Sequence, residues 1–389
     1  MATVPAAYPF IDVTIDTSGL QPVAQRSPGI IAVAGLSNAG DAAANTPTVC
    51  ESLDDAVAHF GTGTALTQSL GLAFLQDPAP SKVYGVKIGN TGADADVLAA
   101  LDSLSGVDDV DFVALAATTD PTLLVHLKDH VEQVSASGSK RMGVAMIDPT
   151  KVKTPTYVTD ILNGIHPTAG GGADLMSSVS RMVIVAARGA KLDDGVTTAD
   201  AAVASMAAIA GYAPATSIVL KPVRGLSIPL PSLYSAAEIT GLSEVNIIPI
   251  ISPAIIVGGG FYFGEGRCFT SDATQLYVDI VRTLDDIDFR LKAGLIGLIG
   301  DARITRPGLT TLRSAAQGIL GPLVRAQEID DFDVEIPILD ILAQPQSTWS
   351  TSDTNLVTTA RSNRAVDMFV SITYGPAVHR LQVTLQPTF

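Results

Sequence analysis

The sequence is poor in cysteine and in cations. Only two of its 389 residues are cysteine, Cys50 and Cys268, so a disulfide scaffold is excluded and a reducing or redox-indifferent setting fits. The 24 Lys and Arg residues stand against 39 Asp and Glu residues, which gives a formal net charge of −15. Because clustered cations drive phosphate binding, this balance argues against nucleic acid as a direct partner.

The chain also lacks a recognisable signal peptide and an unbroken membrane span. Met1–Phe10 has neither the basic start nor the apolar core of a signal peptide. The run Val245–Gly264 carries no charge over a length that would span a bilayer as a helix. Pro249, Pro253 and Gly258–Gly260 divide it into short pieces rich in Ile and Val, so the sequence predicts buried strands and no membrane insertion.

No catalytic, cofactor or metal signature stands out in the sequence. The loop Gly35–Gly40 follows a predicted strand, but it lacks the Lys-Ser/Thr pair of a phosphate loop and the spacing of a dinucleotide fingerprint. His126 and His130 share a helix face, yet further zinc ligands at a fixed spacing are missing. Cys50 has no base beside it, and Trp349 is either an interface anchor or packed on its own domain. We therefore predict no catalytic residue, cofactor or metal site.

Apolar residues are abundant, at 47% against 16% charged residues, so the chain can bury large cores, and its length favours two or three domains. Strand and helix patterns alternate through the first half. Apolar runs at 28–35, 82–88, 111–116, 141–147 and 181–187 predict buried strands, and segments 53–60, 66–75, 97–104, 121–135 and 198–210 predict helices. Ser52 is the expected N-cap of the first helix and Gly61 its stop. This alternation is typical of an α/β layer.

The patterns near the two ends of the chain differ from this alternation. Residues 10–16 alternate apolar and polar side chains up to a Thr-Ser-Gly turn, and they form an isolated strand pattern that must pair with a distant strand or with another molecule. Residues 271–298 and 309–325 predict long helices, and residues 365–373 and 378–385 predict two terminal strands.

Charge is distributed unevenly along the chain. Residues 88–127 and 326–360 contain many Asp and Glu but no Lys or Arg, whereas residues 282–325 are locally basic. Such runs are either solvated faces or complementary patches that meet between copies of the chain, and the sequence leaves both interpretations open.

A set of short motifs follows one order along nearly the whole chain. The segments are Pro9–Val13, Ser27–Gly35, Pro47–Gly61, Ala208–Ala215, Leu220–Leu226, Glu244–Ile248, Gly264–Phe269, Tyr277–Arg282, Arg364–Thr373 and Val378–Leu385. In this order they resemble the tail sheath proteins of contractile phage tails, pyocin-like particles and related injection systems. The pattern departs from that family at Phe10, Pro222 and Glu244, where the family has Gly, and before Gly264, where it has Trp.

The resemblance implies a mixed α/β (α+β) fold in three parts. These are an extended N-terminal arm at 1–25, an outer α/β domain at 26–264 and an inner, tube-facing domain at 265–389, in which helices pack on a small sheet. Terminal arms of neighbouring subunits would complete that sheet by strand addition. The implied arm residues are Phe10, Ile11, Val13, Ile15, Val378, Leu381, Val383 and Leu385.

The function that the resemblance implies is structural and not enzymatic. The chain would polymerise with itself as stacked hexameric rings in a helical array around an inner tube, and it would contract to drive the tube through a target cell envelope. The implied partners are the tail tube, baseplate and tail terminator proteins, in a virion tail or contractile particle assembled in the host cytoplasm. We expect the basic residues Arg303, Arg306, Arg313 and Arg325 to contact the tube or a neighbouring subunit. The alternatives are an α/β enzyme, which would rest on the glycine loop and the strand–helix alternation, and another particle protein such as a capsid protein.

Overall fold

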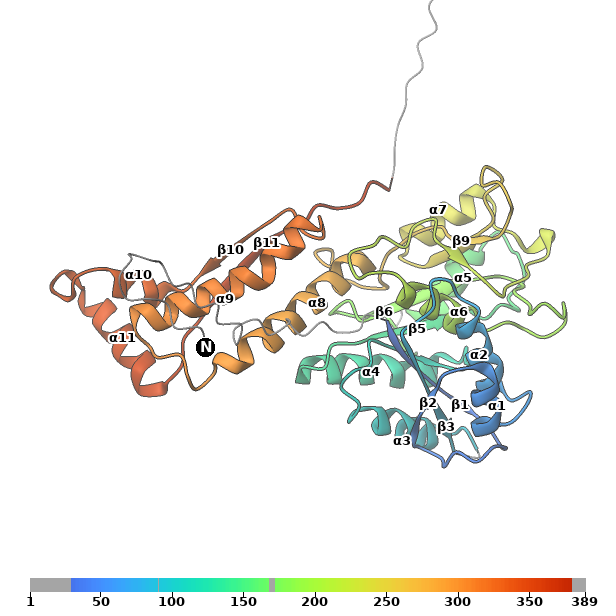
Figure 1. The fold of residues 1–389 in the computed structure, drawn as a ribbon. Helices are drawn as coiled ribbons and strands as arrows, with labels where there is room; N and C mark the ends of the chain where they lie inside the picture. The colour runs from blue at the N-terminus through green and yellow to red at the C-terminus, as the bar shows by residue number, and fades with distance from the viewer. Residues whose placement is uncertain (1–28, 90, 168–171, 380–389) are drawn as a thin grey trace, which may run out of the picture. The chain divides into compact units, whose positions relative to one another are not determined.

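The computed structural model describes residues 29–379, except residue 90 and residues 168–171 (Figure 1). The chain divides into two compact units that interleave along the sequence. The large unit holds the described residues up to 289 together with 320–334 and 369–379, and the small unit holds 290–319 and 335–368. The predicted inner and outer domains concern positions in an assembly and stay a prediction.

A nine-stranded sheet forms the centre of the large unit, in the order β2-β3-β1-β4-β5-β6-β8-β9-β7. Its strands are β1 (Ile30–Leu36), β2 (Pro47–Cys50), β3 (Lys82–Ile88), β4 (Phe112–Leu115), β5 (Met142–Met146), β6 (Met182–Ala186), β7 (Pro222–Val223), β8 (Ile248–Ile251) and β9 (Phe261–Phe263). The strands from β3 to β8 run parallel, whereas β2, β9 and β7 pair antiparallel with their neighbours at the two ends. The predicted α/β layer is confirmed.

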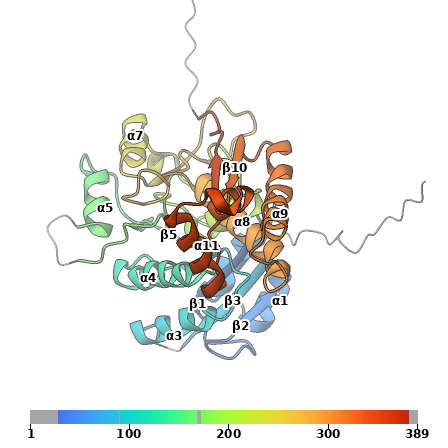
Figure 2. The same cartoon turned by 90° about the vertical axis from the view of Figure 1, so that its left-hand side faces the viewer.

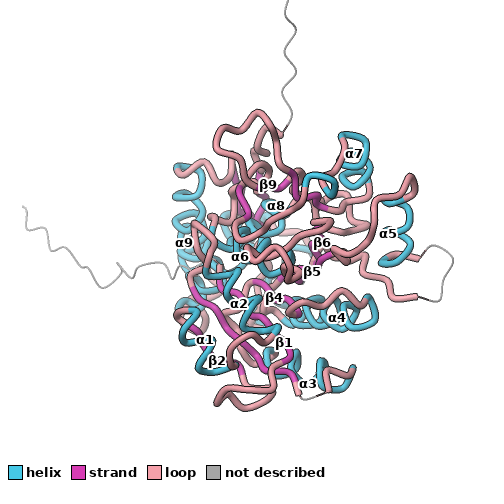
Figure 3. Tube along the Cα trace, turned by 90° about the vertical axis from the view of Figure 1, so that its right-hand side faces the viewer, coloured by secondary structure: helices cyan, strands magenta, loops and turns pink. Residues whose placement is uncertain are grey.

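Helices cover both faces of this sheet, which explains why its central strands are apolar on both sides. One face packs against α1 (Leu53–Phe60), α2 (Ala65–Phe74) and α6 (Ala201–Gly211), and the other against α3 (Asp94–Leu104), α4 (Pro121–Ser137), α5 (Tyr157–Ile165) and α7 (Ala236–Glu244). The side chains of β1 alternate between the two faces. Ile31 and Val33 belong to the core beneath α1, α2 and α6, whereas Ile30, Ala32 and Ala34 belong to the core beneath α3, α4, α5 and α7. Figures 2 and 3 show α1 and α3–α4 on opposite sides of the strands.

The remaining helices lead into the small unit. They are α8 (Val278–Leu295), α9 (Arg306–Arg325), α10 (Pro337–Ala343) and α11 (Thr351–Asn363), with short 3-10 turns at Leu230–Ser232, Ile296–Leu298 and Gln346–Thr348. The small unit has a core of its own, in which Leu309 of α9 packs with Ile336 and Leu339. A separate two-stranded sheet pairs β10 (Asp331–Glu335) with β11 (Phe369–Thr373).

Several local predictions agree closely with the structure. Helix α1 has the predicted bounds, the Ser52 hydroxyl accepts a hydrogen bond from the Asp55 N–H, and Gly61 ends the helix with φ +78°. The sequence analysis did not predict α5, β10, α10 and α11, which the structure contains. A signal for α11 was present, since Ser350 and Asp353 form a capping box at its start.

The uncharged run Val245–Gly264 forms two strands, as predicted, but they are not buried throughout. β8 and β9 pair antiparallel, and Phe263 is fully buried. The loop between them is exposed instead, with Ile255 at 88% and Val257 at 100% of full exposure. None of the described helices combines the length and the hydropathy of a transmembrane helix.

Candidate assembly surfaces

The two-stranded sheet of β10 and β11 leaves strand edges open. Within the described residues each of the two strands has a single neighbour, the other one, so each keeps one edge of unpaired backbone groups. Asp331, Asp333 and Glu335 are exposed on one face of β10, and Val334 is buried on the other. An isolated pair of strands is marginally stable in water, and open edges accept further strands. This sheet is therefore a site where strand addition can occur.

The chain leaves β11 through a segment that is anchored at two points. The Tyr374 hydroxyl donates a hydrogen bond of 2.7 Å to Oδ2 of Asp279, which is 4% exposed. His379 Nε2 lies 2.8 Å from Ser217 Oγ, and its ring meets that of Tyr277 edge to face at 5.1 Å. Burial, and then the Asp279 carboxylate, raise the pKa of Tyr374, so its hydroxyl stays protonated as the donor. These contacts fix the position of residues 374–379, the last residues at this end that the structure describes.

The predicted arm residues can be placed only in part. Phe10, Ile11, Val13, Ile15, Leu381, Val383 and Leu385 lie outside the described residues. Val378 is described, is 82% exposed and lies between the two anchors, beyond the end of β11. The assignment of these eight residues to exchanged strands stays a prediction.

The four predicted basic contact residues lie on or just before α9. Arg303 precedes the helix, while Arg306, Arg313 and Arg325 belong to it. Arg313 is half-buried and the other three are exposed. Within the described part of the chain none of the four side chains forms an ion pair or a hydrogen bond. Their charges are therefore free to meet a partner.

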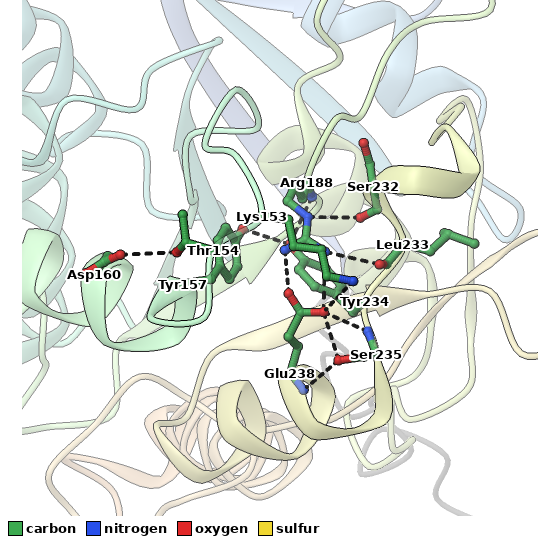
Figure 4. Close-up of polar contacts among 10 residues, drawn as sticks. All are labelled: Lys153, Thr154, Tyr157, Asp160, Arg188, Ser232, Leu233, Tyr234, Ser235 and Glu238. Atoms are coloured by element: carbon green, nitrogen blue, oxygen red, sulfur yellow. Dashed lines mark hydrogen bonds and ion pairs between the residues drawn. The ribbon is translucent and has the colours of Figure 1, made fainter.

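A buried polar cluster joins the loops that follow β5 and β6 to helix α7 (Figure 4). The Arg188 guanidinium is 3% exposed, donates to both carboxylate oxygens of Glu238 and to the Ser232 and Leu233 carbonyls, and stacks between Tyr157 and Tyr234. Burial alone would raise the pKa of Glu238, but hydrogen bonds from Arg188 and Ser235 lower it to about 2. Because every charged group here is satisfied by a protein partner, the cluster holds loops together and offers no free acid or base.

The sequence candidates for chemistry do not come together. Cys50 and Cys268 are buried, and burial raises the pKa of the Cys50 thiol to about 12, which suppresses its reactivity. Among the described residues, no group of three His, Cys, Asp or Glu side chains could hold a metal ion. Trp349 is half-buried, and its indole N–H donates to the Gln344 carbonyl five residues away, within the small unit.

Of the two histidines on one face of α4, His126 and His130, the second has a structural role. His130 is 8% exposed, and its Nε2 lies 3.3 Å from Nη1 of Arg141, which can only donate. The ring must therefore be neutral. Burial, and then the Arg141 charge, lower the pKa of His130 to about 4, which excludes a charged imidazole at neutral pH.

Acidification below pH 6.5 is expected to destabilise the large unit through His130. The unfolded chain takes up this proton near pH 6.5 and the folded chain only near pH 4, so stability falls between these values, by about 3 kcal/mol in total. Urea unfolding at several pH values measures the effect. His130→Gln, which keeps an acceptor for Arg141, should flatten this part of the profile. Parallel profiles for wild type and His130→Gln would contradict this assignment.

Comparisons with known proteins place this fold. No protein-family model matches the sequence, and no curated protein matches it. One similar structure is a chain of the anti-feeding prophage (AFP) baseplate. The match covers 100% of this chain and 100% of the AFP chain, with a TM-score of 0.67 at 14% identity. The sheath complex of an extracellular contractile injection system, PVC, in its contracted state covers 99% of this chain and 98% of its own, with a TM-score of 0.66 at 13% identity.

The likeness extends to a tail protein. The sheath tail protein of Desulfitobacterium hafniense covers 85% of this chain and 93% of its own, with a TM-score of 0.61 at 12% identity. At such identities the agreement is one of fold, and it runs over nearly the whole length of each chain. The resemblance read from the ordered motifs is thereby confirmed: the chain has the fold of the sheath proteins of contractile tails and injection systems.

Proposed function

We propose that the chain is a structural subunit of a contractile sheath. It polymerises with itself as stacked hexameric rings in a helical array around an inner tube, inside a virion tail or a related contractile particle. The observation that carries this proposal is the two-stranded β10–β11 sheet with its open edges, in a chain that has a sheath fold. Strands supplied by neighbouring copies would complete this sheet through main-chain hydrogen bonds.

The anchors at Tyr374 and His379 support this mode of assembly. A segment that reaches another subunit must leave its own body at a fixed place, so that its reach and register are the same in every copy. The hydrogen bonds to Asp279 and Ser217 provide such a place. The exchanged arm then acts as a tether, and subunits can rotate and slide against one another while they remain joined.

Contraction in this proposal draws on contacts between subunits. An extended sheath is metastable, a signal from the baseplate releases it, and new lateral contacts lower its free energy as it shortens and widens. The inner tube, the baseplate and a tail terminator are the partners that such a sheath requires, and the host cytoplasm is the place of assembly. We assign the chain no catalytic step.

Electron microscopy of the purified protein in negative stain, at several salt concentrations, tests the proposal. Hollow, cross-striated tubes are the expected result, alone or after addition of a tube protein as a nucleus. Particles of about 40 kDa under every condition, with and without tube protein, would contradict it.

Reversing the charges of Arg313 and Arg325 to Glu is expected to lower the yield of assembled sheath several-fold at low salt. Both arginines lack an ion-pair partner within the described residues, and Glu preserves helix propensity. The loss should shrink as salt rises, because salt screens exposed charges. Sedimentation of tubes measures the yield.

The matched control is Lys151→Glu with Arg361→Glu, which makes the same change in net charge at exposed sites that have no ion pair within the described residues. This control is expected to assemble normally. Equal yields for wild type and the Arg313 and Arg325 variant would rule out a role of these arginines in assembly.

A further inference from the structure

The loop between β8 and β9 carries an apolar tip that no described residue of its own chain covers. This tip is residues 252–260, which lie within the uncharged run Val245–Gly264. Ile255 is 88% and Val257 100% exposed, and three consecutive glycines with positive φ, Gly258–Gly260, lead the chain back into β9. Full exposure of two branched aliphatic side chains at one loop is unfavourable in water and is typical of a surface that meets a partner.

The same chain has an apolar pocket on the outer side of α1 and α2. Its volume is about 500 Å³, and its walls are Leu53, Val57, Leu72, Phe74, Leu75 and Leu192. Leu53 is 44% and Leu75 51% exposed, so the walls face solvent. A volume in this range is typical of a site for a small organic molecule, so the pocket has room for the side chains of Ile255 and Val257 together.

The rim of the pocket also suits an uncharged tip. Asp193 and Asp194 line it, and Asp194 already accepts hydrogen bonds from the Val196 and Thr197 N–H groups. An acidic partner would be repelled by these two carboxylates. The tip has no charge, and its glycine backbone presents N–H donors without side chains in front of them, which a carboxylate can accept.

We propose that the tip of one copy inserts Ile255 and Val257 into the α1–α2 pocket of a second copy. None of the tip residues lines that pocket within its own chain. Within the described residues, the tip of one chain therefore does not occupy the pocket of the same chain. The contact joins two different surfaces, so each copy keeps a free tip and a free pocket, and the association can repeat in an array. The inference rests on the proposed sheath function and names one of its subunit contacts.

Cysteine cross-linking between two single variants tests this contact. Val257→Cys and Leu75→Cys are purified separately, mixed under assembly conditions and oxidised. A disulfide-linked heterodimer is expected, and neither variant alone should give one. The native Cys50 and Cys268 are 2% and 0% exposed, so we expect them not to form disulfides between subunits. Val152→Cys, on a loop that does not line the pocket and 73% exposed in the wild type, replaces Val257→Cys as the control.

A charge in the tip provides the second measurement. Val257→Asp should raise the concentration needed for assembly about tenfold or more, because its carboxylate would be buried against apolar walls and beside two aspartates. Val152→Asp, the matched exposed control, should leave that concentration unchanged. Circular dichroism checks that both variants fold.

The two outcomes separate this contact from the proposed function. Tubes without the heterodimer cross-link, and with normal assembly of Val257→Asp, would overturn the tip contact and leave the sheath function standing. Absence of both tubes and cross-links in every mixture would overturn the tip contact and count against the sheath function as well.

Discussion

Deletion of residues 1–20 is expected to leave a folded monomer that no longer forms tubes. The described members of the cores of the large unit and of the small unit all follow Gly29, so we expect the truncated chain to fold. Assembly does depend on it in our proposal, because the isolated strand pattern at 10–16 is a strand that a neighbour would receive. The loss of tubes should therefore be complete, whereas the circular dichroism spectrum should change little.

A matched pair of variants sharpens this experiment. The alternation in residues 10–16 predicts that Ile11, Val13 and Ile15 share one face of the strand. Changing these three residues to Asp should reproduce the deletion, while Thr14→Ser on the other face should assemble normally. Long tubes formed by the truncated chain would show that arm exchange is not what joins the subunits.

Replacement of Arg282 by leucine is expected to cost the large unit about 3–5 kcal/mol of stability. Arg282 of α8 is 6% exposed and binds the carboxyl end of α6. Its Nη1 donates to the Ile209 carbonyl at 3.0 Å and its Nη2 to the Tyr212 carbonyl at 2.7 Å, with the Ala213 carbonyl at 3.4 Å from Nη1. Leucine would remove these donors from carbonyls at the end of α6 and just beyond it, where the Ile209 and Ala213 carbonyls keep the Tyr212 and Thr216 N–H groups.

Charge adds to this effect. The carbonyl end of a helix is its negative pole, so a guanidinium there is favourable. Burial lowers the pKa of Arg282 to about 10, partly offset by nearby Asp111 and Asp286, and the side chain remains charged at neutral pH. The leucine variant therefore loses this charge as well as the hydrogen bonds.

Urea unfolding followed by circular dichroism measures the loss, and hydrogen exchange of the α6 amides localises it. Arg282→Lys should recover part of the stability, because one ammonium reaches fewer of the carbonyls. Arg306→Leu, at an exposed arginine without an ion pair in the described part of the chain, should change stability by less than about 0.5 kcal/mol. Equal effects at positions 282 and 306 would contradict the capping role of Arg282.

The sequence by itself determined the elements whose signals are local. Strand β3 (Lys82–Ile88) and helix α1 have the predicted bounds, because apolar runs, an N-cap at Ser52 and a stop at Gly61 act within one or two turns of chain. The α/β class followed from the alternation of such segments. The order of short motifs along the chain indicated the sheath fold, which the comparisons bear out.

Only the tertiary structure decided which surfaces remain open. β10 was read as an acidic stretch, and its pairing with β11 depends on residues about 40 positions apart. The exposed tip lies in a run whose apolar composition favoured burial, but only the ends of that run pair as β8 and β9, and the residues between them lie outside the sheet. In the sequence Arg282 is one charged residue among several. Its role follows from its hydrogen bonds to carbonyl groups about 70 residues earlier in the chain. Such contacts join residues that no local pattern relates, since packing alone brings them together.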